Sequence, residues 1–157
     1  MTKDIHAHLN NETVAELEPH AGLRVSPLTP VGETIKLMQE NRTGCALVCE
    51  GSKLVGIFTE QDYVRRVLGQ HLSPDTPMSA CMSRNPARVR SSESVATLVG
   101  RFHLGRLRRL PVVDEQDRVV GCVSVRNLVH HLAEHFPSAV YNLSPVSKPI
   151  QHDREGA

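Results

Sequence analysis

Apolar positions along this chain gather in short runs that recur in pairs. Residues 45–49 and 110–113 are apolar almost throughout, which is typical of short strands that are covered on both faces. Each run is followed by a polar turn rich in turn-forming residues and by a second, largely apolar run, 54–59 or 119–124. We therefore expect two β-hairpins with mostly buried strands.

Helical patterns flank both hairpins. Short extended pieces at 23–25 and 87–89 precede the first helix of each set. Thr29 and Ser92 lie where helix N-caps are expected, because a hydroxyl there can accept a hydrogen bond from a free backbone N–H. Four stretches are predicted to be helical: 31–41, 60–68, 94–104 and 125–136.

The two sets are copies of one another. Residues 46–67 match residues 111–132 at an offset of 65, and the segments before them match at an offset of 64. Each copy predicts the order β-α-β-β-α, so we expect an α/β (α+β) fold made of two tandem motifs. Because a single copy buries too little apolar surface to be stable alone, the copies should pack with pseudo-twofold symmetry.

The repeat divides the chain into segments. The polar start and the proline-containing end fall outside the copies, and we expect the end to be extended and partly disordered. The predicted segments are an N-terminal segment 1–13, a first motif 14–70, a linker 71–86, a second motif 87–136 and a tail 137–157.

Composition narrows the possible functions. The net charge is +1, from 18 basic and 17 acidic residues, so we expect binding to neither nucleic acid nor membranes. The chain starts without an apolar signal region, and its cysteines form no CxxC pair, so we expect a reducing, cytoplasmic location. Cys45 and Cys49 fit a strand core, whereas Cys81 in the linker is the candidate for the most reactive thiol.

Candidate binding chemistry lies where each hairpin runs into its second helix. The first copy has the sequence GIFTEQD at 56–62 and the second has GCVSVRN at 121–127. The hydroxyls of Thr59 and Ser124, beside a helix N-terminus, suit a phosphate group. The Asp62 carboxylate can accept both hydroxyls of a ribose, whereas Asn127 lacks charge assistance. We therefore expect the first-copy site to be the stronger one.

These heptads resemble the signature of CBS (cystathionine-β-synthase) motifs, which occur in tandem as Bateman modules. The stretch RRLPVVD at 108–114 and the lead-in ACMSRNP at 80–86 are similar to that family as well, and the resemblance covers about residues 14–136. It implies a regulatory, energy-sensing module that binds AMP, ADP, ATP or S-adenosylmethionine and performs no catalysis. It also implies a homodimer that acts on a separate effector protein.

The resemblance also implies a set of contacts. Arg108 and Arg109 would contact phosphates, and the base would lie in an apolar gap formed by one of two equivalent residue sets. The full set of expected ligand-binding residues is Val25, Thr29, Ala46, Ile57, Thr59, Asp62, Val89, Arg108, Arg109, Pro111, Cys122, Ser124 and Asn127.

Other interpretations remain open at this point. The departure at Asn127 favours a protein-interaction adaptor with degenerate ligand sites. His131 and His135 lie four residues apart and could bind a metal, although a solvated helix face fits them better because no HExxH pattern is present. Clustered arginines at 101–109 could contact RNA, but no aromatic residues that could stack on bases are interleaved with them. Asp62 and the two hydroxyls could also be ordinary helix-capping residues.

Overall fold

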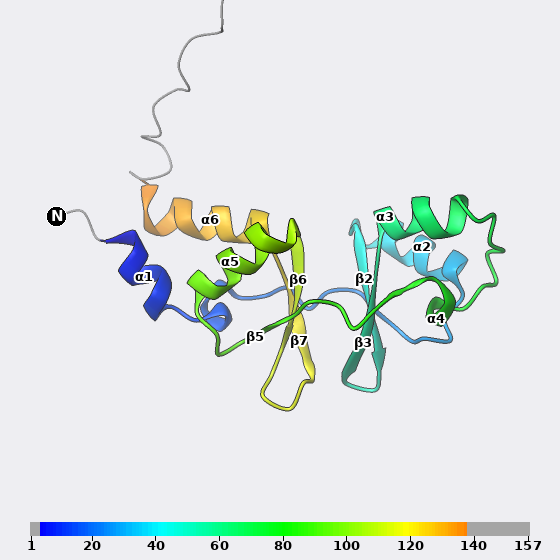
Figure 1. Ribbon diagram of the computed structural model, residues 1–157, viewed down its shortest axis with the longest axis horizontal. Helices are drawn as coiled ribbons and strands as arrows, with labels where there is room; N and C mark the ends of the chain where they lie inside the picture. Colours follow the sequence, from blue (N-terminus) through cyan, green and yellow to red (C-terminus); the bar gives the residue numbers. More distant parts are fainter. Residues whose placement is uncertain (1–3, 138–157) are drawn as a thin grey trace, which may run out of the picture.

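The computed structural model describes residues 4–137, and both predicted hairpins and all four predicted helices are present (Figure 1). The predicted helix at 60–68 is α-helical only in its first turn and continues as a π-helix. In the first motif the elements are β1 (Arg24–Val25), α2 (Val31–Glu40), β2 (Cys45–Glu50), β3 (Lys53–Thr59), α3 (Glu60–Asp62) and the π-helix η2 (Tyr63–Leu68).

The second motif repeats this order after a structured connection. The segment expected to be a plain linker contains a short helix and a short strand, α4 (Met78–Cys81) and β4 (Ser83–Arg84). Then follow β5 (Val89–Arg90), α5 (Val95–Gly105), β6 (Arg109–Val113), β7 (Val119–Ser124) and α6 (Val125–His135).

Two small sheets face one another in the middle of the molecule, and the helices cover their outer sides (Figure 1). One sheet has the order β1-β2-β3-β4 and the other has the order β5-β6-β7. In each sheet the first strand runs parallel to the second, and the hairpin is antiparallel. A shared apolar cluster joins the sheets: Cys45, Leu47, Cys49, Leu54, Val113, Val119 and Cys122. The structure confirms the expected α+β class.

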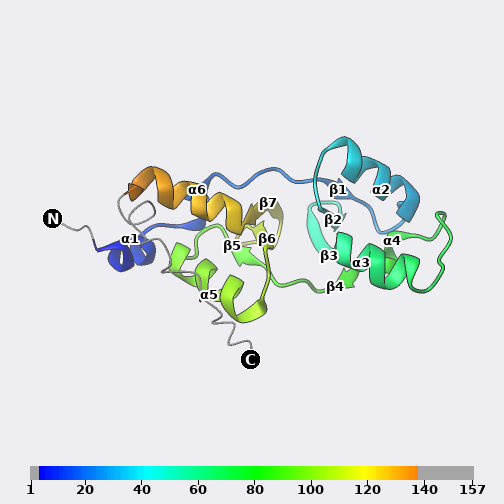
Figure 2. The ribbon, with the colours of Figure 1, turned by 90° about the horizontal axis from the view of Figure 1, so that it is seen from above.

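Each motif's lead-in crosses to the other motif's sheet. Strand β4, which precedes the second motif, pairs with β3 of the first motif. His20, which precedes the first motif, exchanges two backbone hydrogen bonds of 3.0 and 2.7 Å with Cys122 on β7. Figure 2 shows the two crossing segments on opposite edges of the molecule. The motifs are therefore interlocked by backbone pairing as well as by side-chain packing.

These crossings explain the glycine that opens each heptad. A Cβ atom at Gly56 would collide with the Met82 sulfur, and a Cβ atom at Gly121 would collide with the His20 carbonyl oxygen. Glycine therefore leaves room for the Met82 side chain at position 56 and for the crossing backbone of His20 at position 121.

The N-terminal segment contains helices that the sequence pattern missed. Helix α1 (Ile5–Asn11) begins at Asp4, whose side chain accepts a hydrogen bond from the backbone N–H of His6. The 3-10 helix η1 (Val14–Leu17) places two apolar side chains in the core of the second motif. Residues 4–17 therefore form part of the second motif's packing, although they precede β1, the first strand of the first motif, in the chain.

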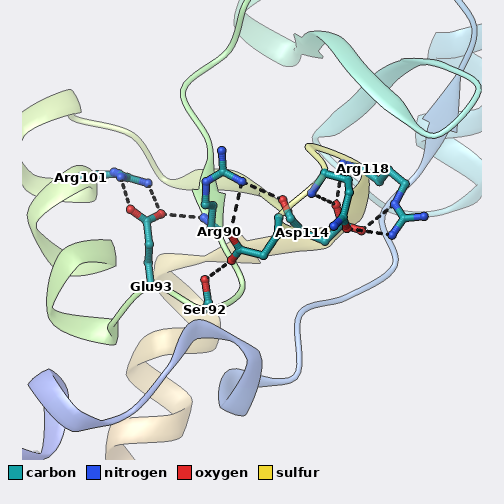
Figure 3. Close-up of polar contacts among 8 residues, drawn as sticks. Arg90, Ser92, Glu93, Arg101, Asp114 and Arg118 are labelled. Carbon is teal, nitrogen blue, oxygen red and sulfur yellow. Dashed lines mark hydrogen bonds and ion pairs between the residues drawn. The ribbon is translucent and has the colours of Figure 1, made fainter.

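Two expected helix caps are wrong. Helix α2 follows Pro30, and the Thr29 hydroxyl accepts instead from the backbone N–H of Ser26. Helix α5 is capped by Ser94, while the Ser92 hydroxyl bonds to the Glu115 carboxylate (Figure 3). A cap must lie immediately before the first helical residue, whereas α2 begins two residues after Thr29 and α5 begins three residues after Ser92.

Ser92 belongs to a polar network at the turn end of the second hairpin. Glu93 accepts from the Arg90 backbone N–H and forms a bidentate ion pair with Arg101 (Figure 3). Asp114 accepts from the Arg118 side chain across the turn between β6 and β7. Arg101, one of the clustered arginines, is therefore committed to an internal ion pair.

The predicted tail lies largely outside the described residues. Among residues 4–137, no helix combines the length and the apolar character that crossing a bilayer requires. The segment boundaries expected from the repeat stay predictions.

Candidate functional site

A cavity of about 1010 Å³ lies where the two motifs meet. The first motif and its lead-in contribute Leu23 and Cys45 to its wall. The second motif contributes Arg109 from β6, Cys122 from β7, and Ser124 and Asn127 from the start of α6. The cavity is therefore composite, and anything bound in it would contact both motifs.

Ser124 and Asn127 form a reciprocal cap at the start of α6. The Asn127 backbone N–H donates to the Ser124 hydroxyl over 3.1 Å, and Asn127 Oδ1 accepts from the Ser124 backbone N–H over 3.0 Å and from its hydroxyl over 2.6 Å. This capping box is why the sequence starts a helix here. The Asn127 side-chain nitrogen lies 2.8 Å from His20 Nε2 of the crossing lead-in.

Arg109 stands at the entrance between the motifs. Its guanidinium donates to the Thr43 hydroxyl of the first motif over 3.2 Å. It lines both the large cavity and a second cavity of about 420 Å³, which also contacts Gly44, Glu60 and Tyr63. The neighbouring Arg108 is exposed and lines neither of these two cavities.

Cys45 has an unusual electrostatic environment for a buried thiol. A hydrogen bond from Cys122 is the main cause that lowers the pKa of the Cys45 thiol to about 6, against the opposing effect of burial. The Arg109 guanidinium, with a nitrogen 3.9 Å from the sulfur, lowers the pKa further. The same contact, together with burial, raises the pKa of the Cys122 thiol. Within this pair, the thiolate form is therefore favoured at Cys45 and the thiol form at Cys122.

The corresponding site of the first copy is occupied by the chain itself. Asp62 Oδ2 accepts from the Thr59 backbone N–H over 2.9 Å and from its hydroxyl over 3.1 Å. Asp62 Oδ1 accepts from the Ser83 hydroxyl over 3.0 Å and lies 3.6 Å from Arg66 Nε. Both carboxylate oxygens are therefore engaged, and neither Thr59 nor Asp62 lines either of the two cavities described above.

Comparison with protein families also finds two copies of one motif in this chain. The CBS domain family model matches the chain twice, over residues 14–69 and 73–134. This chain belongs to the CBS domain family. CBS domains are generally regulatory parts of the proteins that contain them.

Relatives of this CBS pair include short and long proteins. The chain is 31% identical over 122 residues to the CBS domain-containing protein YhcV of Bacillus subtilis, a match that covers 76% of this chain and 86% of YhcV. It is 34% identical over 109 residues to CBSCBSPB1 of Arabidopsis thaliana, which covers 69% of this chain and 20% of that protein. The chain thus spans about a fifth of the length of its plant relatives.

Solved structures share the fold of this CBS pair. A CBS domain protein from Pyrobaculum aerophilum in complex with AMP has a TM-score of 0.69 and 21% identity, covering 82% of this chain and 95% of that one. The CBS domain pair of MJ0100, in complex with 5′-methylthioadenosine and S-adenosyl-L-methionine, has a TM-score of 0.68 and 21% identity, covering 76% and 98%. At this identity the likeness concerns the fold alone.

The structure of this CBS pair gathers only part of the expected ligand set. Arg109, Cys122, Ser124 and Asn127 meet in the large cavity. The others lie elsewhere: Val25, Ala46 and Val89 are in the motif cores, Pro111 is buried, Ile57 packs between the sheets, Thr29 precedes α2, and Arg108 is exposed.

Several functional residues were not found from the sequence. His20 and Leu23 line the cavity because the lead-in of the first motif crosses to the second motif. The pattern of apolar and polar residues within one strand does not show such a crossing. Cys45 was assigned to the core, and it is buried, but it also lines the cavity. The repeat was the signal that could have found His20. At the offset of 64, His20 corresponds to Arg84, which lies on the crossing strand β4.

Two further expectations are wrong. Cys81 is fully buried, and burial raises the pKa of its thiol, so it is not the reactive cysteine. His131 does not lie on a solvated face, because it is 9% exposed and contacts Glu12. In both cases the local sequence predicts an exposed side chain, and a segment from elsewhere in the fold buries it.

Proposed function

We propose that this CBS pair is a regulatory module that binds an adenosine-containing nucleotide in the composite cavity and acts on a separate effector protein. The observation that carries the proposal is the convergence of Arg109, Ser124 and Asn127 on one cavity between the motifs. The AMP complex and the complex with S-adenosyl-L-methionine of proteins with the same fold support an adenosine ligand.

Each group in the cavity suits a different part of such a ligand. The Arg109 guanidinium and the N-terminus of the 11-residue helix α6 both favour phosphate oxygens. Asn127 can accept from a ribose hydroxyl, as the heptad predicts, when its Oδ1 releases the hydrogen bond from the Ser124 hydroxyl. Leu23 and Cys122 supply apolar surface against which a base can pack. We propose the remaining predicted residues only as indirect contributors, through the cores that hold these side chains in place.

The charge of the cavity favours phosphorylated nucleotides over S-adenosylmethionine. Arg42, Arg109 and Arg126 line it, its described lining residues include no aspartate or glutamate, and the Cys45 thiolate offsets only one of the three positive charges. A phosphate tail gains from this positive field, whereas the sulfonium and ammonium groups of S-adenosylmethionine are repelled by it. We therefore propose AMP, ADP or ATP as the ligand class.

Regulation would follow from the composite wall. Because the cavity has walls from both motifs, a bound nucleotide favours the arrangement that brings Arg109 and α6 closest to Leu23 and Cys45. An effector protein that distinguishes this arrangement from the empty one would be coupled to nucleotide concentration. A cytoplasmic location and a homodimer remain parts of the same proposal.

Calorimetric titration with AMP, ATP and S-adenosylmethionine tests the proposal. Arg109→Gln should weaken nucleotide binding at least tenfold, which corresponds to ~1.4 kcal/mol. Arg108→Gln is the matched control, because it removes the same charge from an exposed neighbour that lines neither of the two cavities. Equal weakening by both variants, or stronger weakening by Asp62→Asn, would contradict the proposed site.

A second candidate is an interaction adaptor with degenerate ligand sites. It is favoured by the internal contacts of the polar groups, because Asp62 has both carboxylate oxygens engaged and the Asn127 amide lies against His20. Folded protein that gives no heat with any of the three ligands would favour this adaptor. The search would then turn to partner proteins.

A further inference from the structure

A buried group of three potential metal ligands lies on the side of the second motif where helix α1 meets helix α6. His8 is on α1, Glu12 follows α1, and His131 is on α6. His131 Nε2 lies 2.7 Å from Glu12 Oε1, and His8 Nε2 lies 3.1 Å from Glu12 Oε2. One ligand atom from each residue can be chosen so that all three lie within 4.8 Å of one another.

This group is buried more deeply than surface ion pairs are. Glu12 and His131 are each 9% exposed, and the His8 side chain is 35% exposed. By contrast, the neighbouring pair of His130 and Glu134 on the same helix has side chains that are 75% and 60% exposed. Burial of a carboxylate is costly unless its charge is compensated.

The two contacts with Glu12 compensate its charge only if the imidazoles carry a proton, and their geometry is not that of hydrogen bonds. His8 Nε2, Glu12 Oε2 and His131 Nε2 are inaccessible to solvent, and none makes a hydrogen bond of acceptable geometry within residues 4–137. Three buried polar atoms that converge without being satisfied are rare in native proteins and need a physical explanation. A cation between them would satisfy all three at once.

The dimensions and the donor types suit a transition-metal ion. Two ligands of a tetrahedral zinc ion lie roughly 3.4 Å apart when each bond is about 2.1 Å. The observed separations of 2.7 and 3.1 Å, each to a different oxygen of Glu12, therefore need to open by about 0.7 and about 0.3 Å. Imidazole nitrogens favour zinc, nickel, cobalt or iron over magnesium and calcium, which prefer oxygen ligands.

Aromatic packing holds both imidazole rings in position. The His131 ring stacks on His135, with centroids 4.1 Å apart. The His8 ring meets the edge of Phe136, with centroids 4.7 Å apart and planes at 76°. Ligands that packing already holds lose little freedom when a metal binds.

We propose that His8, Glu12 and His131 form a binding site for a divalent transition-metal ion of the zinc type. Three protein ligands leave at least one coordination position for water or another small donor. The ion would tie helix α1 to helix α6. Because His130 and Ala133 of α6 also line the large cavity, the ion would also stabilise one wall of that cavity. The site itself does not depend on the proposed nucleotide binding.

The test is zinc retention by the full-length protein. Metal-free protein incubated with Zn²⁺ and then dialysed should retain about one ion per chain by elemental analysis, and its melting temperature should rise by several degrees. His8→Gln and His131→Gln should each weaken zinc binding at least about tenfold and abolish the rise in melting temperature. Cobalt substitution should give the visible absorption of a low-symmetry site in the wild type only.

The matched control is His130→Gln, which removes an exposed imidazole from the same helix and should bind zinc like the wild type. Circular dichroism establishes that each variant is folded. Should His131→Gln fail to fold, His8→Gln decides the matter, because His8 is on the short, more exposed helix. Folded wild-type protein that retains no zinc would overturn the proposal, and so would variants that all retain zinc or a His130→Gln variant that loses it equally.

Discussion

At the residue scale, the neighbours of a side chain decide its chemistry more than its type does. Cys45 and Cys81 are both buried thiols, yet the pKa of one is lowered and that of the other is raised. Cys45 has a hydrogen bond from Cys122 and the charge of Arg109 beside it, whereas desolvation dominates at Cys81. Only Cys45 is therefore expected to be a thiolate at neutral pH.

Alkylation as a function of pH tests this difference. Because the pKa of Cys45 is about 6, its thiolate fraction, and hence its labelling rate with iodoacetamide, should level off above about pH 7. Labelling of Cys81 should still rise at pH 9, because the pKa of its thiol is raised. Peptide mass spectrometry follows each site. Arg109→Gln should move the Cys45 midpoint upward, and a midpoint near pH 9 in the wild type would contradict the assignment.

At the element scale, each hairpin pairs with the lead-in of the other motif. The close approach is made possible by Gly56 on β3 and Gly121 on β7. The obstacle differs between them, because a side chain at Gly56 would meet the flexible end of Met82, whereas one at Gly121 would meet the His20 backbone. The two glycines occupy equivalent positions in the repeat, but an added side chain is tolerated better at position 56 than at position 121.

Alanine substitutions measure that inequality. Gly121→Ala should lower the free energy of unfolding by about 1–3 kcal/mol, because the strand or the crossing segment must shift. Gly56→Ala should cost less, because the Met82 sulfur can move. Gly100→Ala is the control in α5, where nothing lies within 4 Å of the added Cβ, and it should stabilise by up to ~1 kcal/mol through helix propensity. Urea denaturation gives all three values. A larger loss for Gly56→Ala than for Gly121→Ala would contradict this ranking.

At the scale of the whole molecule, the N-terminal segment completes the second motif. Val14 is fully buried among Val95, Leu98 and other side chains of that motif's core. The order of the chain and the order of packing therefore differ. This arrangement makes the stability of the second motif dependent on residues that precede the first.

Val14→Ala tests this dependence. It removes two buried methyl groups and should lower the free energy of unfolding by about 2 kcal/mol. Leu28→Ala is the control, because Leu28 is 81% exposed and its loss should change the stability by less than ~0.5 kcal/mol. Chemical denaturation monitored by circular dichroism compares the two. Equal small losses would mean that the N-terminal segment does not contribute to the core.

Assembly is a second prediction at this scale. The sequence predicts a homodimer through apolar helix faces near Ile35, Leu37, Met38, Tyr63, Val64 and Val67. Met38 and Val67 are buried within their own motif, whereas Val64 is 59% exposed. Analytical ultracentrifugation at tens of micromolar should show a dimer, which is the range where a modest interface associates. Val64→Glu should shift it toward monomer, and a wild-type monomer at that concentration would contradict the prediction.

The sequence by itself determined the two hairpins, the helices around them and the doubled motif, because local periodicity records which face of each element is buried. It also placed Ser124 and Asn127 at a helix start, since a capping box spans only four residues.

Only the tertiary structure decided which distant segments meet. His20 and Asn127 are 107 positions apart and lie in contact, and Glu12 covers His131 from the opposite end of the described chain. The lowered pKa of the Cys45 thiol follows from the contact of the two sheets, and the engagement of Asp62 by Ser83 follows from the crossing of β4. The composite cavity has walls from both motifs and from the crossing lead-in. A pattern along one strand or helix contains no record of the crossings, because they depend on how the two motifs exchange their lead-ins.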